Sequence, residues 1–333
     1  DHRFYSHGAI DVFTTARSFI ENIRNKELSN GGSTITQQLA KNIYFTQEKS
    51  FIRKVAELFV AVDLAKKENL KSIVFTFKNN PISYFSNILT REIITEDEKM
   101  DKLKSLGVDV VIDIPFNKEM ANISAENFVK EILVDKLGVK KLIIGHDFAF
   151  AKNREGTPAV LEILGKKYGF TVDIIGAVTI NNIRVSSTYV KDLIYAGRVE
   201  EIKSYLGRNY FIEGQVIHAK QLGRTIGFPT ANIKLEENLI IPKRGIYATK
   251  VHIGNDIYFG ATNIGYNPTV NGEKMSIETN ILKFNEDIYG KTIKLEFLER
   301  IRDEKKFKDL NELKIQLKMD TNYIYKKYIC KSS

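Results

Sequence analysis

Cysteine is almost absent from this sequence: the single one, Cys330, lies close to the carboxyl end. One cysteine excludes an internal disulfide and a cysteine-rich zinc site, and it is typical of proteins from a reducing compartment. No run of about 18 apolar residues occurs. The first residues, Asp1-His2-Arg3, do not begin a secretory signal. We therefore expect a cytoplasmic protein with no stable insertion into a membrane.

Tryptophan is absent as well, and the six prolines stand in expected loops rather than in a hinge. The 333 residues exceed what one core usually holds, and 43% of them are hydrophobic, so two or more folded domains are expected. The formal net charge is +9, but the lysines are spread along the sequence among acidic residues. This pattern favours a solvated basic surface, and we expect no nucleic-acid partner.

The spacing of apolar residues changes along the chain. Up to about residue 63 it is helical, most clearly in residues 50–64. From 71 to 177, short β-rich runs alternate with amphipathic helices that carry end signals, such as the cap Thr157 and the stop Gly169. This alternation predicts a doubly wound parallel sheet, a fold that binds nucleotides at the carboxyl ends of its strands.

After residue 209 the apolar residues alternate with a period of two. Gly254-Asn255-Asp256 supplies a hairpin turn, and a terminal helix is expected over 309–328. The predicted strands cover residues 210–219, 244–253, 256–265, 274–282 and 291–301. Many closely spaced strands without helices between them predict a small closed antiparallel barrel.

The segment QLGRTIGFPTANI, residues 221–233, has the composition of a phosphate-binding loop. It combines glycines that let backbone amides approach a polyphosphate, a fixed positive charge, and hard oxygen donors that suit magnesium. These candidate residues are Gly223, Gly227, Arg224, Thr230 and Asn232.

Glu278 stands on the predicted strand 274–282. Strand alternation puts Ser276, Glu278 and Asn280 on one face, and it puts Met275, Ile277 and Ile281 on the other. On this spacing alone, Glu278 is either a solvated strand carboxylate or a catalytic base, and the pattern leaves both open.

In order and spacing of motifs, the segment from about Asn209 to Asp320 resembles the riboflavin kinase module of bacterial bifunctional riboflavin kinase/FAD synthetases. The motifs are QLGRTIGFPTANI, PKRGIYA, ATNIGYNPTV, SIETNI and DIYGKTIKLEFLERIRDEKKF. The resemblance implies that Thr230 and Asn232 hold Mg2+ and the ATP phosphates, and that Glu278 takes the proton of the ribityl hydroxyl. Phosphoryl transfer needs little else beyond positioning. Ala219 departs from the family, which usually has glycine there.

The middle segment resembles the FMN adenylyltransferase module of the same enzymes. The matching segments are IIGHDFAFAKNREGT and RVSSTYVKDLI, in which Lys191 replaces the usual arginine and loses its bidentate fork. The implied nucleotide-binding residues are Gly145, Asp147, Phe148, Ser186, Ser187 and Thr188, with Phe150 beside them.

One part of that module has no counterpart here. The family opens with a strand and a glycine-histidine turn, Phe-Asp-Gly-x-His-x-Gly-His, whose histidines neutralise the ATP phosphates. Without this turn the transition state loses charge stabilisation, so we expect adenylyl transfer to be lost or weak. We also expect an incomplete sheet that lacks a central strand.

Residues 1–63 resemble the glycosyltransferase domain of class A penicillin-binding proteins, which polymerise a lipid-linked peptidoglycan precursor. The motifs are DHRFYSHGAID, GGSTITQQLAKNIYF and RKVAEL. They match the family through Asp1, Phe4, His7, Gly32, Ser33, Thr34, Gln37, Gln38, Arg53, Lys54 and Glu57. The family's general-base glutamate, one position before Asp1, and a second glutamate in a later motif are absent, so we expect no glycosyl transfer. The lipid-linked precursor would be a partner only if this fragment were functional.

These resemblances predict four segments: a helical glycosyltransferase-like fragment (1–63), a truncated α/β domain (64–187), a helical bridge (188–208) and a riboflavin-kinase-like barrel (209–330). One helix could cross the junction near residues 63–66. Because the two families work on opposite sides of the plasma membrane, the chain is either a recombined, truncated or artificially joined product or a purposeful fusion, and the sequence leaves both open.

The leading functional hypothesis is an ATP-dependent, magnesium-requiring riboflavin kinase that releases FMN. Its rivals are a peptidoglycan glycosyltransferase and a non-catalytic flavin- or nucleotide-binding protein.

Overall fold

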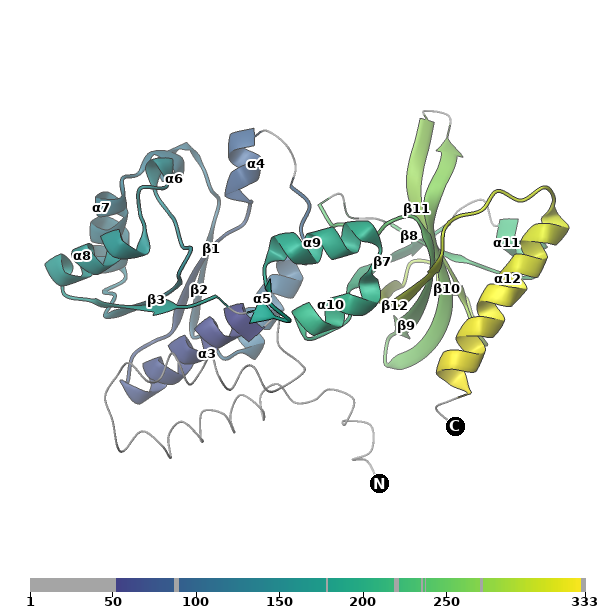
Figure 1. The fold of residues 1–333 in the computed structure, drawn as a ribbon, viewed down its shortest axis with the longest axis horizontal. Helices are drawn as coiled ribbons and strands as arrows, with labels where there is room; N and C mark the ends of the chain where they lie inside the picture. Colours follow the sequence, from purple (N-terminus) through teal and green to yellow (C-terminus); the bar gives the residue numbers. More distant parts are fainter. Residues whose placement is uncertain are drawn as a thin grey trace, which may run out of the picture. The chain divides into compact units, whose positions relative to one another are not determined.

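The computed structural model describes residues 52–86, 90–177, 179–218, 222–234, 236, 238–269 and 272–330. Within these ranges the side chains of 52–57, 59, 222, 224, 267–269 and 272–274 are left undescribed. An α/β part comes first in the chain and a β-barrel follows (Figure 1). In the described ranges no helix is both long and apolar enough to cross a membrane.

The predicted N-terminal helical fragment lies outside the described residues up to residue 51. From there α3 (Ile52–Lys67) runs without a break, so one helix does cross the junction expected near 63–66. Val62 and Ala65, on its inner side, are buried.

The α/β part contains two pairs of parallel strands. β1 (Ile73–Phe77) pairs with β2 (Val110–Ile114), and β3 (Lys141–Gly145) pairs with β4 (Thr171–Ile175). Among the described residues the two pairs form separate sheets. The parallel pairing confirms the predicted fold class, and the separation of the pairs agrees with an incomplete sheet.

Helices surround these strands. They are α4 (Pro81–Ser86), α5 (Glu96–Ser105), α6 (Lys118–Asn122), α7 (Ala125–Asn127), its wider continuation η1 (Phe128–Lys136), the short turn η2 (Lys152–Arg154) and α8 (Pro158–Tyr168). The predicted end signals of α8 are confirmed. Thr157 Oγ1 accepts a hydrogen bond from the backbone N–H of Val160 at 3.4 Å, and Gly169 ends the helix in the left-handed region.

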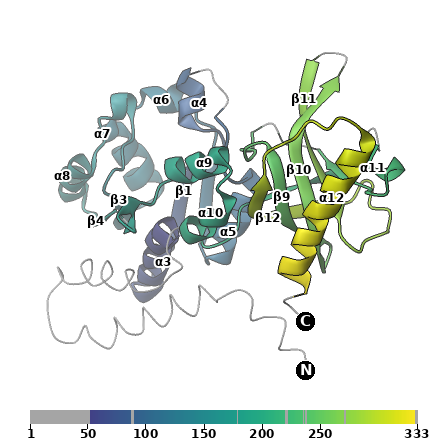
Figure 2. The same ribbon diagram turned by 45° about the vertical axis from the view of Figure 1, so that its right-hand side comes forward.

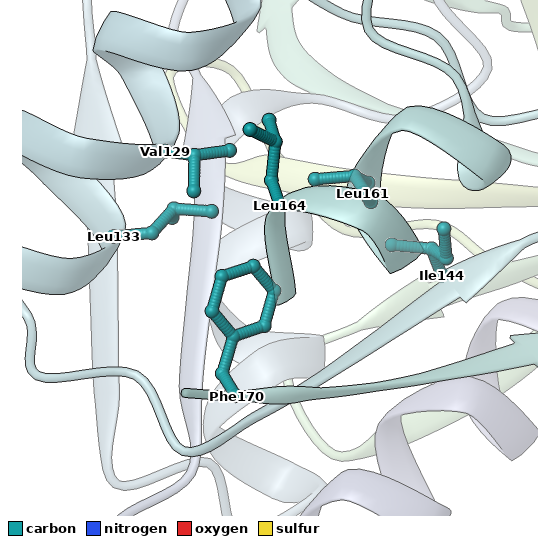
Figure 3. Close-up of a cluster of buried hydrophobic side chains, with 6 residues drawn as sticks. All are labelled: Val129, Leu133, Ile144, Leu161, Leu164 and Phe170. Atoms are coloured by element: carbon teal, nitrogen blue, oxygen red, sulfur yellow. The ribbon is translucent and has the colours of Figure 1, made fainter. Parts of the chain in front are cut away.

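A small core holds η1, α8 and β3 together (Figure 3). It consists of Val129, Leu133, Ile144, Leu161, Leu164 and Phe170. Burying each large apolar side chain contributes about 1.5–3 kcal/mol. By contrast, no residue of β1, β2 or β4 is fully buried. Parallel strands are normally covered on both faces, so this part of the sheet is only half enclosed.

A hairpin and two helices lead from the α/β part to the barrel. The hairpin is β5 (Thr179–Ile180) and β6 (Ile183–Arg184), and the helices are α9 (Ser187–Ala196) and α10 (Val199–Leu206). Gly197 and Gly207 end the two helices with positive φ. These helices cover most of residues 188–208, the segment for which the sequence predicts a helical bridge.

The barrel is closed by six antiparallel strands in the order β10-β11-β8-β7-β12-β9. The strands are β7 (Phe211–Ile217), β8 (Ala231–Ile233), β9 (Gly245–Ile253), β10 (Asp256–Thr269), β11 (Gly272–Ile281) and β12 (Thr292–Arg302). Inside, three fully buried threonines from β9, β10 and β11 are joined through their hydroxyls: Thr249 and Thr262 at 2.8 Å, and Thr262 and Thr279 at 2.9 Å.

The C-terminal helix α12 (Leu310–Ile324), extended by η3 (Tyr325–Ile329), covers the outside of the barrel (Figure 2). Ile324 packs there on Ala248 and Ala261. Asp309 caps the helix by accepting a hydrogen bond from the N–H of Glu312 at 2.8 Å. The barrel and its C-terminal helix are confirmed as predicted. The short α11 (Leu222–Thr225) lies between β7 and β8.

Candidate functional site

Glu278 has an asparagine opposite it on each side. It lies in the middle of β11, and its register partners are Asn232 of β8 and Asn263 of β10. Side chains directly opposite on antiparallel strands have Cβ atoms about 4.5–5.5 Å apart. The neighbours of Glu278 along β11, Ile277 and Thr279, are fully buried. Since side chains alternate along a strand, the row Asn232–Glu278–Asn263 projects from the outer face of the barrel.

The predicted phosphate loop folds tightly before β8. The N–H of Phe228 donates to the carbonyl of Gly223 at 2.8 Å. A Cβ on Gly223 would clash with the carbonyl oxygen of Phe228, and Gly227 has a φ of +85°. Both positions therefore require glycine because of the fold of the loop itself. The side chain of Arg224 and the whole of Ala219 lie outside the described residues.

Thr230 and Asn232 connect this loop to the row on the outer face. The methyl of Thr230 lies 3.4 Å from the position that a Cβ on Gly223 would take, so the hydroxyl-bearing residue stands against the loop. Asn232 follows on β8, opposite Glu278, and is 8% exposed. The structure thus brings the two predicted metal ligands and the predicted base into one neighbourhood.

A cavity of about 380 Å³ opens beside the loop. Asn280, two residues from Glu278 on the same face of β11, donates from Nδ2 to the carbonyl of Pro229 at 2.8 Å and so joins the two walls. The lining residues are Gly227, Phe228, Pro229, Asn280, Ile281, Leu282, Lys283, Phe284, Asn285 and Thr321. The cavity borders the row on the outer face through Asn280.

The predicted residues of the α/β part also gather. Ser186 caps α9 by accepting from the N–H of Tyr189 at 3.2 Å, and Ser187 and Thr188 are exposed in the first turn. Arg184, just before this turn, forms an ion pair with Asp147 of the loop after β3. A helix N-terminus with exposed hydroxyls suits an anionic phosphate.

The loop after β3 is short and ordered. It begins at Gly145, whose carbonyl accepts from the N–H of Phe148 at 3.0 Å. The Phe148 ring is 39% exposed and stacks on Phe150, with 5.6 Å between ring centroids. An exposed aromatic face thus lies next to Asp147.

Lys191, on α9, contacts two residues from a distant part of the chain. Its Nζ donates to the carbonyl of Arg91 at 2.5 Å and lies 3.7 Å from a carboxylate oxygen of Glu92. The charge that the sequence places in the phosphate signature is therefore already engaged in this structure.

The sequence reasoning missed a cluster of aromatic rings at the carboxyl ends of β1 and β2. Phe116 makes edge contacts with Phe77, Tyr84 and Phe85, and the Phe85 side chain is 67% exposed. Its signal was available, since β1 ends in Phe77 and Phe116 stands two residues after the end of β2. Ligands of doubly wound folds bind outside the carboxyl ends of the strands, which is where this cluster lies.

Two family comparisons cover most of the described chain. Residues 206–328 match the riboflavin kinase family, and residues 56–189 match the FAD synthetase family. The bifunctional riboflavin kinase/FMN adenylyltransferase of Bacillus subtilis is 36% identical over 270 residues, which are 78% of this chain and 83% of the relative. The chain belongs to the bifunctional riboflavin kinase/FMN adenylyltransferase family.

Further relatives agree with this assignment. The family member of Escherichia coli strain K12 is 36% identical over 257 residues, which are 77% of this chain and 82% of the relative. The family member of Buchnera aphidicola from Acyrthosiphon pisum is 32% identical over 311 residues, which are 92% of this chain and 97% of the relative. A crystal structure from Streptococcus pneumoniae, described as a macrolide-efflux protein, has a TM-score of 0.74 at 32% identity and covers 83% of this chain and 90% of that one.

Membership of this family makes the chain a transferase, and it confirms the resemblances of the middle and C-terminal segments. The resemblance of residues 1–63 to penicillin-binding proteins is supported by none of these matches. Its motif residues from Asp1 to Gln38 lie outside the described residues, as do the side chains of Arg53, Lys54 and Glu57.

Proposed function

We propose that the barrel transfers the γ-phosphate of ATP to the 5'-hydroxyl of riboflavin and releases FMN and ADP. The observation that carries this proposal is the position of Glu278 directly opposite Asn232, beside the tight loop from Gly223 to Thr230. A general base must lie within reach of the attacking hydroxyl while the phosphates are held next to it. The outer face of the barrel offers both features at one place.

The residues present fit a magnesium ion. Thr230 and Asn232 offer a hydroxyl and an amide oxygen, which are hard, neutral donors, and ATP phosphates would complete such a shell. Within the described ranges no group of three or more histidine, cysteine or acidic side chains could hold a metal, so a carboxylate-rich site is not available there. When bound, Mg2+ neutralises charge on the phosphates.

Glu278 acts on the acceptor. Its carboxylate takes the proton of the 5'-hydroxyl while the hydroxyl oxygen forms a bond to the γ-phosphorus. The bond between the γ-phosphorus and the bridging oxygen breaks, and ADP leaves with the electron pair. The cavity bordered by Gly227, Pro229 and Asn280 is the proposed seat of the nucleoside of ATP.

For the α/β part we propose nucleotide binding at the N-terminus of α9, with adenylyl transfer lost or weak. Exposed Ser187 and Thr188 and the neighbouring Asp147 loop support the binding. The proposed weak transfer is supported by the histidines of the chain. Of five, only His146 falls within residues 64–187, and the sequence Phe-Asp-Gly-x-His-x-Gly-His does not occur. The division into segments 1–63, 64–187, 188–208 and 209–330 is part of this proposal.

The test incubates the full chain with riboflavin and Mg-ATP and separates the flavins by chromatography. Glu278→Gln should lower kcat by about 10²–10⁴, the usual contribution of a general base. Glu213→Gln is the matched control, because Glu213 is an exposed strand carboxylate of the same barrel. FMN formation that survives Glu278→Gln unchanged would refute the assigned base. FAD formed at a rate similar to FMN would refute the proposed loss of adenylyl transfer.

A further inference from the structure

The side-chain amide of Asn263 has an unusual environment. Its side-chain oxygen Oδ1 is buried, and among the described residues no partner donates a hydrogen bond to it. The other buried side-chain atoms in this condition belong to Glu96, Glu299 and Arg300, each of which also forms an ion pair. A buried polar atom without a partner is destabilising, so its retention calls for an explanation.

The position of Asn263 points to a ligand rather than to the core. Its neighbours on β10, Thr262 and Ile264, are fully buried in the interior of the barrel, so Asn263 projects to the outer face. There it lies opposite Glu278 on one side and opposite Ile246 of β9 on the other. The only polar register partner of Asn263 is therefore the proposed base.

A second carboxylate, that of Glu304, lies near the amide of Asn263. A Cβ on Gly265 would clash with Oε1 of Glu304, and it would lie 3.3 Å from Nδ2 of Asn263. The missing side chain of Gly265 thus leaves room for Glu304 next to the amide nitrogen. A carboxylate attracts an N–H group and repels a carbonyl oxygen, so this neighbour favours the orientation in which Nδ2 faces Glu304 and Oδ1 is turned away.

We propose that Asn263 is a substrate-binding residue of the kinase site that selects acceptors with a polyhydroxylated chain. Its Oδ1 accepts a hydrogen bond from the hydroxyl next to the one that is phosphorylated, the 4'-hydroxyl of riboflavin. Two opposed residues then hold two hydroxyls on adjacent carbons: Glu278 holds the attacking one and Asn263 its neighbour. This inference rests on the proposed kinase function.

The arrangement explains why an asparagine occupies this position. If Asn263 served packing alone, an apolar side chain of similar size would fill the space without leaving an unpaired oxygen. An acceptor without the neighbouring hydroxyl would leave Oδ1 unpaired in the complex, and a site built to bond a substrate hydroxyl rejects such analogues. The inference therefore predicts discrimination between acceptors that differ by one oxygen atom.

The test is a cycle of two enzymes and two substrates, with the full chain and saturating Mg-ATP. Parent and Asn263→Leu are each assayed with riboflavin and with 4'-deoxyriboflavin. On riboflavin, Asn263→Leu should lower kcat/KM about tenfold, mainly by raising the KM for the flavin, while the KM for ATP stays constant. With the parent, kcat/KM should be about tenfold lower for 4'-deoxyriboflavin than for riboflavin. With Asn263→Leu, kcat/KM should be the same for both flavins.

Two further variants keep the result interpretable. Asn263→Asp keeps the acceptor oxygens and should retain sensitivity to the 4'-hydroxyl; it also covers the case in which Asn263→Leu does not fold. Asn311→Leu, an exposed asparagine on α12, is the control for an added leucine and should change neither KM.

The outcomes separate this inference from the proposed function. If removal of the 4'-hydroxyl lowers kcat/KM equally in the parent and in both Asn263 variants, the role of Asn263 is overturned. The 4'-hydroxyl would then be bound by another residue. A parent that phosphorylates neither flavin would instead overturn the kinase proposal itself.

Discussion

Asn232 and Glu278 face each other across the antiparallel pair β8–β11. One belongs to the segment that resembles a phosphate loop, and the other lies mid-strand in a different motif. Because register fixes which side chains meet, a change in the alignment of β8 would move the proposed metal ligand away from the proposed base. The chemistry of the site therefore depends on three paired residues of a very short strand.

Removal of the Asn232 amide should weaken the use of magnesium. We expect Asn232→Ala to raise the half-saturating Mg2+ concentration about tenfold, a loss of about 1.4 kcal/mol in binding free energy, because one hard oxygen donor disappears. The measurement is FMN formation during a Mg2+ titration at fixed ATP. Asn311→Ala, on the exposed side of α12, should leave the titration unchanged. An unaltered Mg2+ requirement in Asn232→Ala would exclude Asn232 as a ligand.

The fold of the phosphate loop can be tested through its glycines. Gly223→Ala places a methyl against the carbonyl oxygen of Phe228, so the loop must shift at a cost of about 1–3 kcal/mol. We expect a raised KM for ATP and a lowered kcat. Gly254→Ala is the control: Gly254 has a φ of +59° and lies in the β9–β10 turn, away from the loop. It should reduce stability without changing the KM for ATP; equal KM changes in both variants would contradict the role of the loop.

Glu296 should make the stability of the barrel depend on pH. Burial alone would raise the pKa of this carboxyl, but hydrogen bonds from Asn209 Nδ2 at 2.7 Å and from His252 Nε2 at 2.9 Å hold it below 4.5. The stabilising contribution is then fully present above the unfolded pKa and is lost as the pH falls through the lowered, folded pKa.

Urea unfolding of the parent and Glu296→Gln between about pH 5.5 and pH 3.5 measures this contribution. We expect the parent's advantage in unfolding free energy to shrink toward the acid end. Glu213→Gln, which changes an exposed carboxylate of β7, is the control variant. A difference that stays constant over this range would show that the hydrogen bonds do not favour the ionised form.

The core of the α/β part should be separable from catalysis in the barrel. Leu161 is fully buried in a cluster made only of α/β residues. We expect Leu161→Ala to lower the unfolding free energy of that part by about 2–5 kcal/mol, with the kcat of FMN formation unchanged. Thermal unfolding followed by circular dichroism, together with the kinase assay, tests this. A parallel fall of kcat would show that the kinase site depends on the α/β core.

The sequence predicts those elements whose local signals agree with their packing. Thr157, Pro158 and Gly169 mark both ends of α8, and Asp309 marks the start of α12, because capping acts through neighbours in the chain. β8 was not predicted as a strand: Ala231–Ile233 is too short for alternation to appear, and only its partners in the barrel make it extended.

The residues of the site divide in the same way: local motifs predict some of them, and only cross-strand contacts reveal the others. Thr230, Asn232 and Glu278 are found from motifs, and the barrel brings them together. Asn263 was missed, because its importance arises from cross-strand register and from an unpaired oxygen, neither of which a single strand reveals. The engagement of Lys191 by Arg91 and Glu92 depends on contacts across about a hundred residues of chain, beyond the reach of local patterns.

The hydrogen-bonded hydroxyls of Thr249, Thr262 and Thr279 help to fix the register of β11 in the barrel. A slip of β11 by one residue would turn Glu278 inward and expose Thr279, leaving the remaining hydroxyls without mates in an apolar surrounding. A misaligned pairing of β11 is thus disfavoured from within the barrel. The alignment of the outward-facing residues therefore depends on hydrogen bonds on the inner face of the same strands.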